Sequence, residues 1–186
     1  MTKKNIRVLF AAYVLLAAAA SAPFWYGKLA DKMGWHQESP IAFADFGPDA
    51  EKFSMSSNGQ ALAFERLDGT WQVNGKPADQ DAVRTFFDVL KTTTTGRIAS
   101  RNRDNRAVYG VDETSGYALH LEQGGKTLDV IVGKAIPGGT AYYLRKTSDD
   151  TVYEASGSLR QLVTRPESNW IPDPAKEESS VVQSVP

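Results

Sequence analysis

Cysteine is absent from this chain of 186 residues. Without it the protein has no disulfide, no thiolate nucleophile, no zinc site with cysteine ligands and no lipid anchor on cysteine. A chain of this length can bury a core large enough to fold without cross-links. The absence therefore excludes several kinds of chemistry, yet it is compatible with export from the cytoplasm.

Positive charge is not in excess, and histidine is scarce. The chain has 21 Lys and Arg against 22 Asp and Glu, a net charge of −1. Nucleic acid binding needs a basic patch, so we expect no nucleic acid partner. The two histidines, His36 and His120, are far apart in the sequence. The alternating pattern around His120 favours a solvated side chain on the polar face of a strand over a catalytic base.

Glycine-rich and acidic segments are present, but they do not form a recognised site. The glycines at 133, 138 and 139 lie between predicted strands, whereas a phosphate-binding loop joins a strand to a helix. The acidic pairs at 112–113 and 149–150 lack the ligand spacing of a calcium loop. Hairpin and turn chemistry explains both sets better. We therefore expect no catalytic residue, no metal and no cofactor, and a protein that is not an enzyme.

A long apolar run occupies residues 8–26. It contains nineteen residues without a charged side chain, and as a helix it would span about 28 Å, close to the thickness of the hydrocarbon core. Basic residues before the run predict a cytoplasmic N-terminus, and aromatic rings at its end favour the headgroup region. We predict a single transmembrane helix in the lipid bilayer. The flanking residues are Lys3, Lys4 and Arg7 before the run, and Phe24, Trp25 and Tyr26 at its end.

The alternative to an anchor is a cleavable signal peptide. Ala18, Ala20 and Ala22 supply the small residues that a cleavage site needs. Pro23 would directly follow one of the possible sites, and the apolar run continues to Tyr26. Both features favour the uncleaved helix, while cleavage after Ala20 stays open.

The chain divides into five parts. We expect residues 1–7 in the cytoplasm, the transmembrane helix over 8–26 and a juxtamembrane connector over 27–50, interrupted by Pro40 and Pro48. A globular domain outside the cytoplasm follows over 51–171. Residues 172–186 are rich in Pro, Ser and Glu with little to bury, and we predict that they are disordered.

Strands with tight turns dominate the globular part. Apolar and polar residues alternate before Asp68-Gly69, and this pair is a strong signal for a type I′ hairpin turn. Asn74-Gly75 indicates the next turn in the same way. Further alternating or apolar runs predict strands near residues 97–101, 117–122, 128–132, 140–146 and 151–155.

One amphipathic helix is clear. Asp79 is a plausible N-cap, and Val83, Phe86, Phe87 and Leu90 then recur at the spacing of a helix face. The β-branched residues 92–95 and Gly96 should end it. A short helix from about Ser158 should end before Pro166.

The expected fold is therefore α+β. An N-terminal transmembrane helix precedes a mainly antiparallel β domain with one main amphipathic helix and one short helix. The core should contain Trp71, Phe86, Phe87, Leu90, Leu119, Leu121 and Val130.

An ordered set of short motifs resembles the domain-of-unknown-function 4340 family of bacterial envelope proteins. The motifs run in the right order and spacing between about Gln60 and Pro166. They comprise Phe64-Glu65-Arg66 with Trp71-Gln72-Val73, Pro77-Ala78-Asp79, Tyr109-Gly110-Val111-Asp112, Val130-Ile131-Val132-Gly133, Pro137-Gly138-Gly139, Tyr143-x-Arg145 and Val152-Tyr153.

The resemblance implies a bacterial inner-membrane protein with an N-terminal anchor, an extracytoplasmic α+β domain and association with ABC-transporter systems. It implies no catalytic residues. Many members are longer and carry further copies of the domain. The 109–112 motif also has a structural interpretation, in which Gly110 permits a tight turn, Asp112 bonds to the local backbone and Tyr109 packs beneath.

Our leading hypothesis is a non-enzymatic accessory subunit that docks on other membrane proteins, such as an ABC-transporter complex. Tyr142, Tyr143 and Arg145 are candidate partner-binding residues because Tyr and Arg are enriched in interface hot spots. Alternation would expose either Tyr143 with Arg145 or Tyr142 with Leu144, although an ordinary cross-strand pair explains the same residues. A periplasmic ligand- or glycan-binding module is the alternative hypothesis, and an unrecognised hydrolase is the third.

Overall fold

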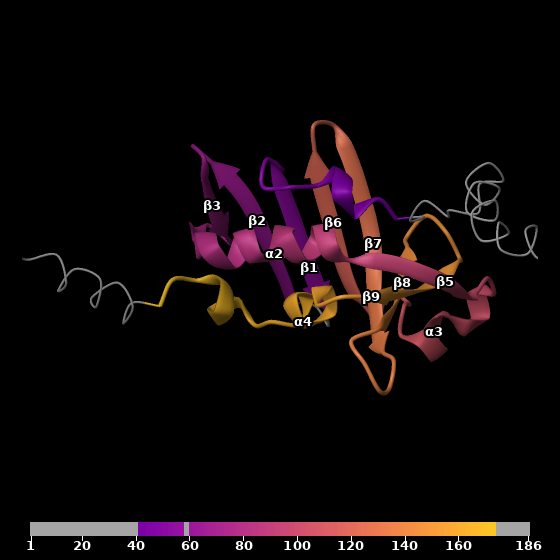
Figure 1. Ribbon diagram of the computed structural model, residues 1–186. Helices are drawn as coiled ribbons and strands as arrows, with labels where there is room; N and C mark the ends of the chain where they lie inside the picture. The colour runs from indigo at the N-terminus through magenta and orange to yellow at the C-terminus, as the bar shows by residue number, and fades with distance from the viewer. Residues whose placement is uncertain (1–40, 58–59, 174–186) are drawn as a thin grey trace, which may run out of the picture. The chain divides into compact units, whose positions relative to one another are not determined.

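The computed structural model describes residues 41–57 and 60–173 (Figure 1). The predicted anchor over 8–26, most of the predicted connector and most of the C-terminal tail lie outside these residues. Within the described residues, no helix is both long and apolar enough to cross a membrane.

The described residues form one antiparallel sheet of nine strands, so the mainly antiparallel α+β fold is confirmed. The strand order is β4-β3-β2-β1-β6-β7-β8-β9-β5, and every neighbouring pair is antiparallel. The strands are β1 (Lys52–Ser57), β2 (Gln60–Leu67), β3 (Thr70–Val73), β4 (Lys76–Pro77), β5 (Thr94–Ser100), β6 (Tyr117–Gln123), β7 (Lys126–Ala135), β8 (Tyr142–Lys146) and β9 (Val152–Ser156).

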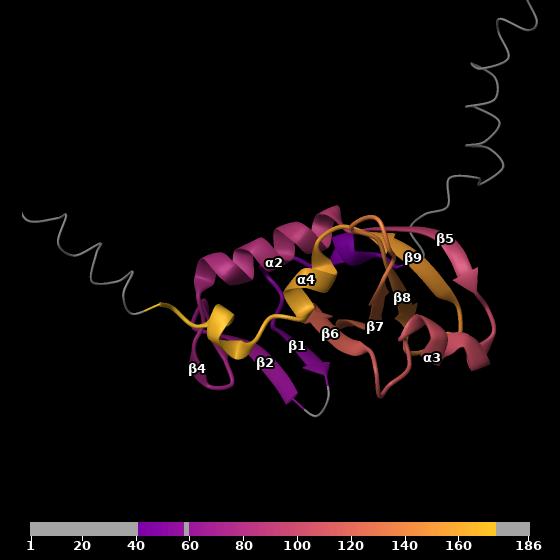
Figure 2. The same ribbon diagram turned by 90° about the horizontal axis from the view of Figure 1, so that it is seen from below.

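The main helix connects the two edges of this sheet. Helix α2 (Gln80–Thr92) leaves β4 at one edge and leads to β5 at the other, so it crosses the strands (Figure 1). Figure 2 shows α2 and α4 (Leu159–Val163) on the same side of β1, β2 and β6. The remaining helical segments are α3 (Arg106–Tyr109) and the 3₁₀ turns η1 (Phe43–Asp45), η2 (Arg103–Asn105) and η3 (Glu167–Trp170).

Local sequence chemistry fixes the hairpins and the start of α2. Positive φ angles occur at Asp68 and Gly69 (49° and 82°) and at Asn74 and Gly75 (49° and 77°), as the predicted type I′ turns require. The Asp79 side chain accepts hydrogen bonds from the backbone N–H groups of the second and third helical residues, at 2.9 and 3.1 Å. The predicted N-cap is thereby confirmed.

Aromatic rings fill the space between α2 and the sheet. Phe53 of β1 stacks on Phe64 and Phe86, with ring centroids 4.2 and 4.6 Å apart. Phe87 and Trp71 meet the same ring edge-on, at 5.5 and 5.2 Å. The predicted core is confirmed, because Trp71, Phe86, Phe87, Leu90, Leu119, Leu121 and Val130 are each at most 5% exposed.

The packed domain begins earlier than the predicted start at residue 51. Ile41, Phe43, Phe46 and Ala50 are buried in the main core, and η1 contacts α2. The backbone N–H of Gly47 donates to the side-chain oxygen of Gln123 at 2.7 Å. Four apolar residues spread over an irregular segment have no helix or strand period, so periodicity did not reveal this part of the core.

Phe86→Ala should lower the free energy of unfolding by about 3–5 kcal/mol, because it removes buried surface and leaves a cavity at the centre of the aromatic cluster. Denaturant unfolding measures the change. Leu67→Ala is the control: Leu67 is 50% exposed, and its truncation should change stability by less than about 0.5 kcal/mol. Equal effects at the two positions would contradict the assigned core.

Candidate functional site

The structure places the predicted partner-binding residues inside the domain. The side chains of Tyr142 and Arg145 are fully buried, as is Leu144 between them. Tyr143 is half-buried and packs edge-to-face on Tyr109, with ring centroids 4.6 Å apart. The expectation that one pair points outward is wrong, because both faces of β8 are covered. One face lies in the main core, and residues 101–116, which we call the rear loop, cover the other.

The buried guanidinium of Arg145 forms hydrogen bonds to two neighbouring segments. Its Nε donates to the carbonyl oxygen of Val111 at 3.0 Å, and its Nη2 donates to a carboxylate oxygen of Glu113 at 2.8 Å. Its Nη1 lies 3.0–3.2 Å from the carbonyl oxygens of Lys146, Thr147 and Asp149. A buried charge is tolerated when its hydrogen bonds are satisfied in this way. Arg145 therefore ties the rear loop to β8 and to the turn that follows β8.

Glycines allow the rear loop to lie directly against β7. A Cβ on Gly133 would lie 2.5 Å from the carbonyl oxygen of Tyr109, and a Cβ on Gly116 would lie 2.2 Å from Ile131 Cγ2. Gly110 ends α3 in the left-handed conformation, at φ 65°. Gly133 is thus a close-approach residue inside a strand, and the hairpin-turn interpretation of it is wrong. Gly138 does belong to the β7–β8 connection, as predicted.

Asp112 closes the turn of the rear loop, as its structural interpretation predicts. Its Oδ1 accepts from the backbone N–H groups of Thr114 and Ser115, at 3.0 and 2.9 Å, and its carboxylate also accepts from both hydroxyls. The Ser115 and Thr114 hydroxyls hold the pKa of this carboxyl well below its usual range. An acid that stays ionised and locally bonded is a poor proton acceptor near neutral pH.

His120 lies on the uncovered face of the sheet beside an acidic neighbour. Its side chain is 36% exposed, and Nδ1 lies 2.7 Å from a carboxylate oxygen of Asp129 across the strand pair. This is the cross-strand pairing of a half-exposed sheet face. Among the described residues, no group of three or more His, Asp and Glu side chains is placed to hold a metal ion.

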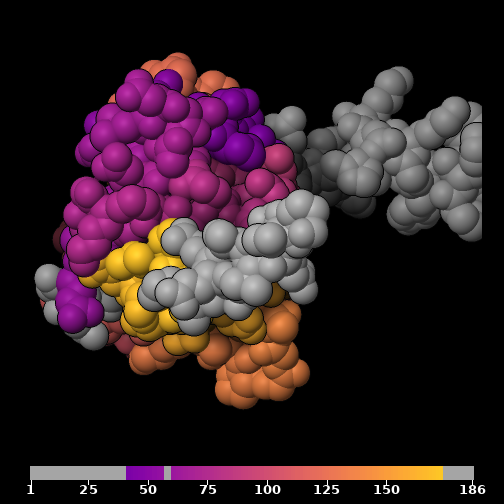
Figure 3. Space-filling view, turned by 90° about the vertical axis from the view of Figure 1, so that its left-hand side faces the viewer, coloured from indigo at the N-terminus to yellow at the C-terminus, as the bar shows by residue number. Residues whose placement is uncertain are grey.

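A cleft lies elsewhere, between the sheet and the C-terminal segment. It has a volume of about 640 Å³ and opens beside residues 163–168, which join α4 to η3. Its apolar lining comes from Met55, Ala61, Leu62, Tyr117, Val163 and Pro166. Polar side chains of Ser56, Gln60, Thr164, Arg165, Glu167 and Ser168 complete it. Figure 3 shows the C-terminal segment (yellow) at the surface, between the α2 side of the domain and the β7–β8 connection.

One positive charge in this cleft is not neutralised within the described residues. Glu167 pairs with Lys76, with Nζ 3.0 Å from its carboxylate. The half-buried guanidinium of Arg165 makes no hydrogen bond or ion pair with any residue in 41–57 or 60–173. The sequence analysis missed this cleft because its walls lie about a hundred positions apart. The only local signal is an Arg-Pro pair that stops a short helix.

Gly133→Ala should lower the free energy of unfolding by about 1–3 kcal/mol, because the added methyl group forces the rear loop away from β7. The matched control is Gly139→Ala. A Cβ there would have its nearest neighbour at 3.9 Å, so its effect should stay within about 0.5 kcal/mol. Thermal or denaturant unfolding of both variants checks this, and a neutral Gly133→Ala would mean that the loop does not press on β7.

The chain was compared with known proteins and with protein families. No curated protein and no solved structure matches the chain. A family described as Domain of unknown function (DUF4340) matches residues 71–176. The match covers more than half of the chain, and it includes α2, the rear loop and the segment that lines the cleft. The chain therefore belongs to the DUF4340 family.

Proposed function

We propose that this protein is a non-enzymatic accessory subunit, anchored in the bacterial inner membrane, that docks on a larger envelope complex through the cleft beside residues 163–168. The observation that carries the proposal is the cleft itself. Its volume of about 640 Å³ lies within the range of protein binding sites, and its lining combines apolar and polar side chains in about equal number. An ABC-transporter complex is the partner class that the family resemblance suggests.

Binding accounts for the cleft better than catalysis does. Its one carboxylate, Glu167, already pairs with Lys76, and its other charged group is Arg165, which cannot act as a base near neutral pH. Three carboxyls of the described residues have lowered pKa values, and all three lie outside the cleft. Asp112 and Asp149 form turn hydrogen bonds with their own neighbours, and Glu113 accepts from the guanidinium of Arg145. Because these carboxyls with shifted pKa values lie outside the cleft, they do not provide the cleft with a general acid or base.

A ligand- or glycan-binding module is the second candidate. Tyr117 contributes an aromatic ring to the cleft lining, and the guanidinium carbon of Arg160 lies 5.9 Å from the centre of that ring. An aromatic body with a polar rim suits a sugar ring as well as a peptide side chain. The two candidates differ in what the cleft retains: a protein subunit or a small molecule.

Thr164→Trp should fill the rim of the cleft and lower the amount of co-purified partner by about tenfold, the effect of roughly 1.4 kcal/mol of lost binding energy. The measurement is the protein content of complexes isolated from membranes in mild detergent. Thr85→Trp on α2 is a matched control, because both threonines are exposed and both hydroxyls donate to a carbonyl of their own helical turn. Equal retention of the partner by both variants would contradict the docking role of the cleft.

The proposed anchor predicts the topology of the chain. The basic residues before the run at 8–26 and the aromatic residues at its end should place the globular domain outside the cytoplasm. A reporter enzyme that works only outside the cytoplasm should be active when it is fused after Pro186. Activity of a cytoplasm-specific reporter at the same position would contradict the topology. A mature N-terminus at Ser21 would show a cleaved signal peptide instead.

A further inference from the structure

The cleft presents a cation beside an apolar surface, and this combination specifies its occupant. Arg165 has no acidic partner among the described residues, while Met55, Leu62 and Val163 line the same space. A half-buried guanidinium that pairs with a carboxylate recovers part of the solvation that it loses on burial. The best occupant is therefore a chain segment with carboxylates next to small apolar side chains.

The C-terminal part of this chain has that chemistry. Residues 174–186 read PAKEESSVVQSVP, with two adjacent carboxylates at Glu177 and Glu178 and two adjacent apolar residues at Val181 and Val182. The segment contains one basic residue, Lys176, so it carries a net negative charge. The segment therefore complements the cleft in two ways: its carboxylates match the charge of Arg165, and its valines match the apolar lining.

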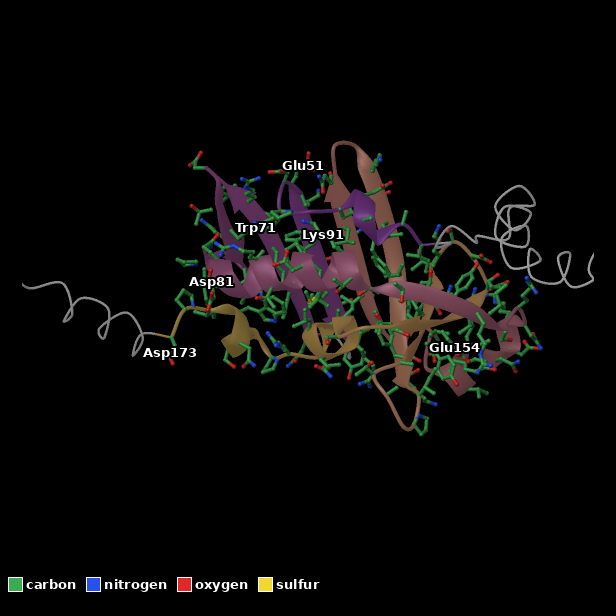
Figure 4. All side chains as sticks on the ribbon, in the orientation of Figure 1. Glu51, Trp71, Asp81, Lys91, Glu154 and Asp173 are labelled. Atoms are coloured by element: carbon green, nitrogen blue, oxygen red, sulfur yellow. The ribbon has the colours of Figure 1, made fainter. Side chains whose placement is uncertain are left out.

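The segment is also attached within reach of the cleft. Glu167, in the cleft wall, precedes the last described residue, Asp173, by six positions, which span at most about 20 Å even when fully extended. Residues 174–182, when extended, can span about 30 Å, which is enough to return from Asp173 to the cleft. Figure 4 labels Asp173 on the same side of the domain as Asp81 at the start of α2. The η3 turn is held there by a hydrogen bond from the Asp79 N–H to the Trp170 carbonyl, at 2.8 Å.

We propose that residues 174–186 fold back into the cleft, with the carboxylates of Glu177 and Glu178 at Arg165 and the valines against the apolar lining. The inference rests on the proposed function, since it takes the cleft as the docking site. The tail then occupies that site until a partner displaces it. One partly exposed ion pair and two valines make a weak contact, but a tethered segment acts at an effective concentration in the millimolar range. Such a contact is populated and still easy to displace.

Met55 offers a direct reporter for the tail. The chain has three methionines, and Met55 lines the cleft, so methyl-labelled full-length protein in detergent should give one methionine signal from this site. Replacing Glu177, Glu178, Val181 and Val182 together by Gln, Gln, Ser and Ser should shift the Met55 signal. A peptide of residues 174–186 added at millimolar concentration should return it to the wild-type position.

Arg165→Gln should at least halve this tail-dependent shift. Arg101→Gln is the matched control and should leave it unchanged, because Arg101 is exposed and does not line the cleft. An unchanged Met55 signal in the tail variant would overturn the proposal. So would a shift that depends on protein concentration, which would indicate a second copy, or equal effects of the two arginine changes. If the tail fails this test while Thr164→Trp still releases the partner, the proposed function stands and only the inference about the tail falls.

Discussion

The rear face of this domain depends on the buried guanidinium of Arg145. Five acceptors surround it: Val111 and Glu113 of the rear loop, Lys146 at the end of β8, and Thr147 and Asp149 of the turn that follows. Removing the charge would leave the buried carbonyl group of Val111 and three partly buried carbonyl groups without this donor, which is costly. The ion pair of Arg106 with Asp150 joins the same two segments from outside. The same loop lies so close to β7 that a Cβ on Gly133 would be 2.5 Å from the carbonyl oxygen of Tyr109.

On the opposite face, helix α2 connects β4 and β5, which lie at the two edges of the sheet. Because α2 makes that crossing, its apolar stripe meets β1 through Phe86 and β3 through Phe87. The side chain of Gln80, the first helical residue, bonds to both the N–H and the carbonyl of Trp71, each at 3.1 Å. It thus satisfies the backbone N–H of Trp71 and adds a second donor to the Trp71 carbonyl, which already accepts from the Ala78 N–H at 3.0 Å. Trp71 and α2 lie together in Figure 4.

Sequence reasoning succeeded where the determining interactions are local. The Asp68-Gly69 turn, the Asp79 cap and the stripe from Val83 to Leu90 each follow from residues a few positions apart. Sequence reasoning failed where segments distant in the sequence pack on both faces of a strand. Alternation in β8 correctly separates Tyr142 from Tyr143, but it does not reveal that a loop from residues 101–116 covers the second face. The strand β5 begins at Thr94 and includes Gly96, which local propensity assigned to the end of the helix.

The candidate site was hidden from the sequence for the same reason. The cleft combines Met55 and Leu62 with Tyr117 and residues 163–168, segments that only the order of strands β2, β1 and β6 and the return of the chain bring together. The motif residues that suggested an interaction surface, above all Arg145, instead fix the scaffold. The family resemblance directed attention to these motif residues, while burial and hydrogen bonding show that Arg145 and Tyr142 are packed inside the domain.

Hydrogen exchange of the backbone amides tests this scaffold role of Arg145 most directly. Arg145→Met keeps the aliphatic volume but removes every donor. Amides of residues 106–116 should then exchange at least about tenfold faster, the result of 1.4 kcal/mol or more of lost local stability, while those of α2 keep their protection. Unchanged exchange in 106–116 would contradict the account, and so would loss of protection at α2 to the same extent.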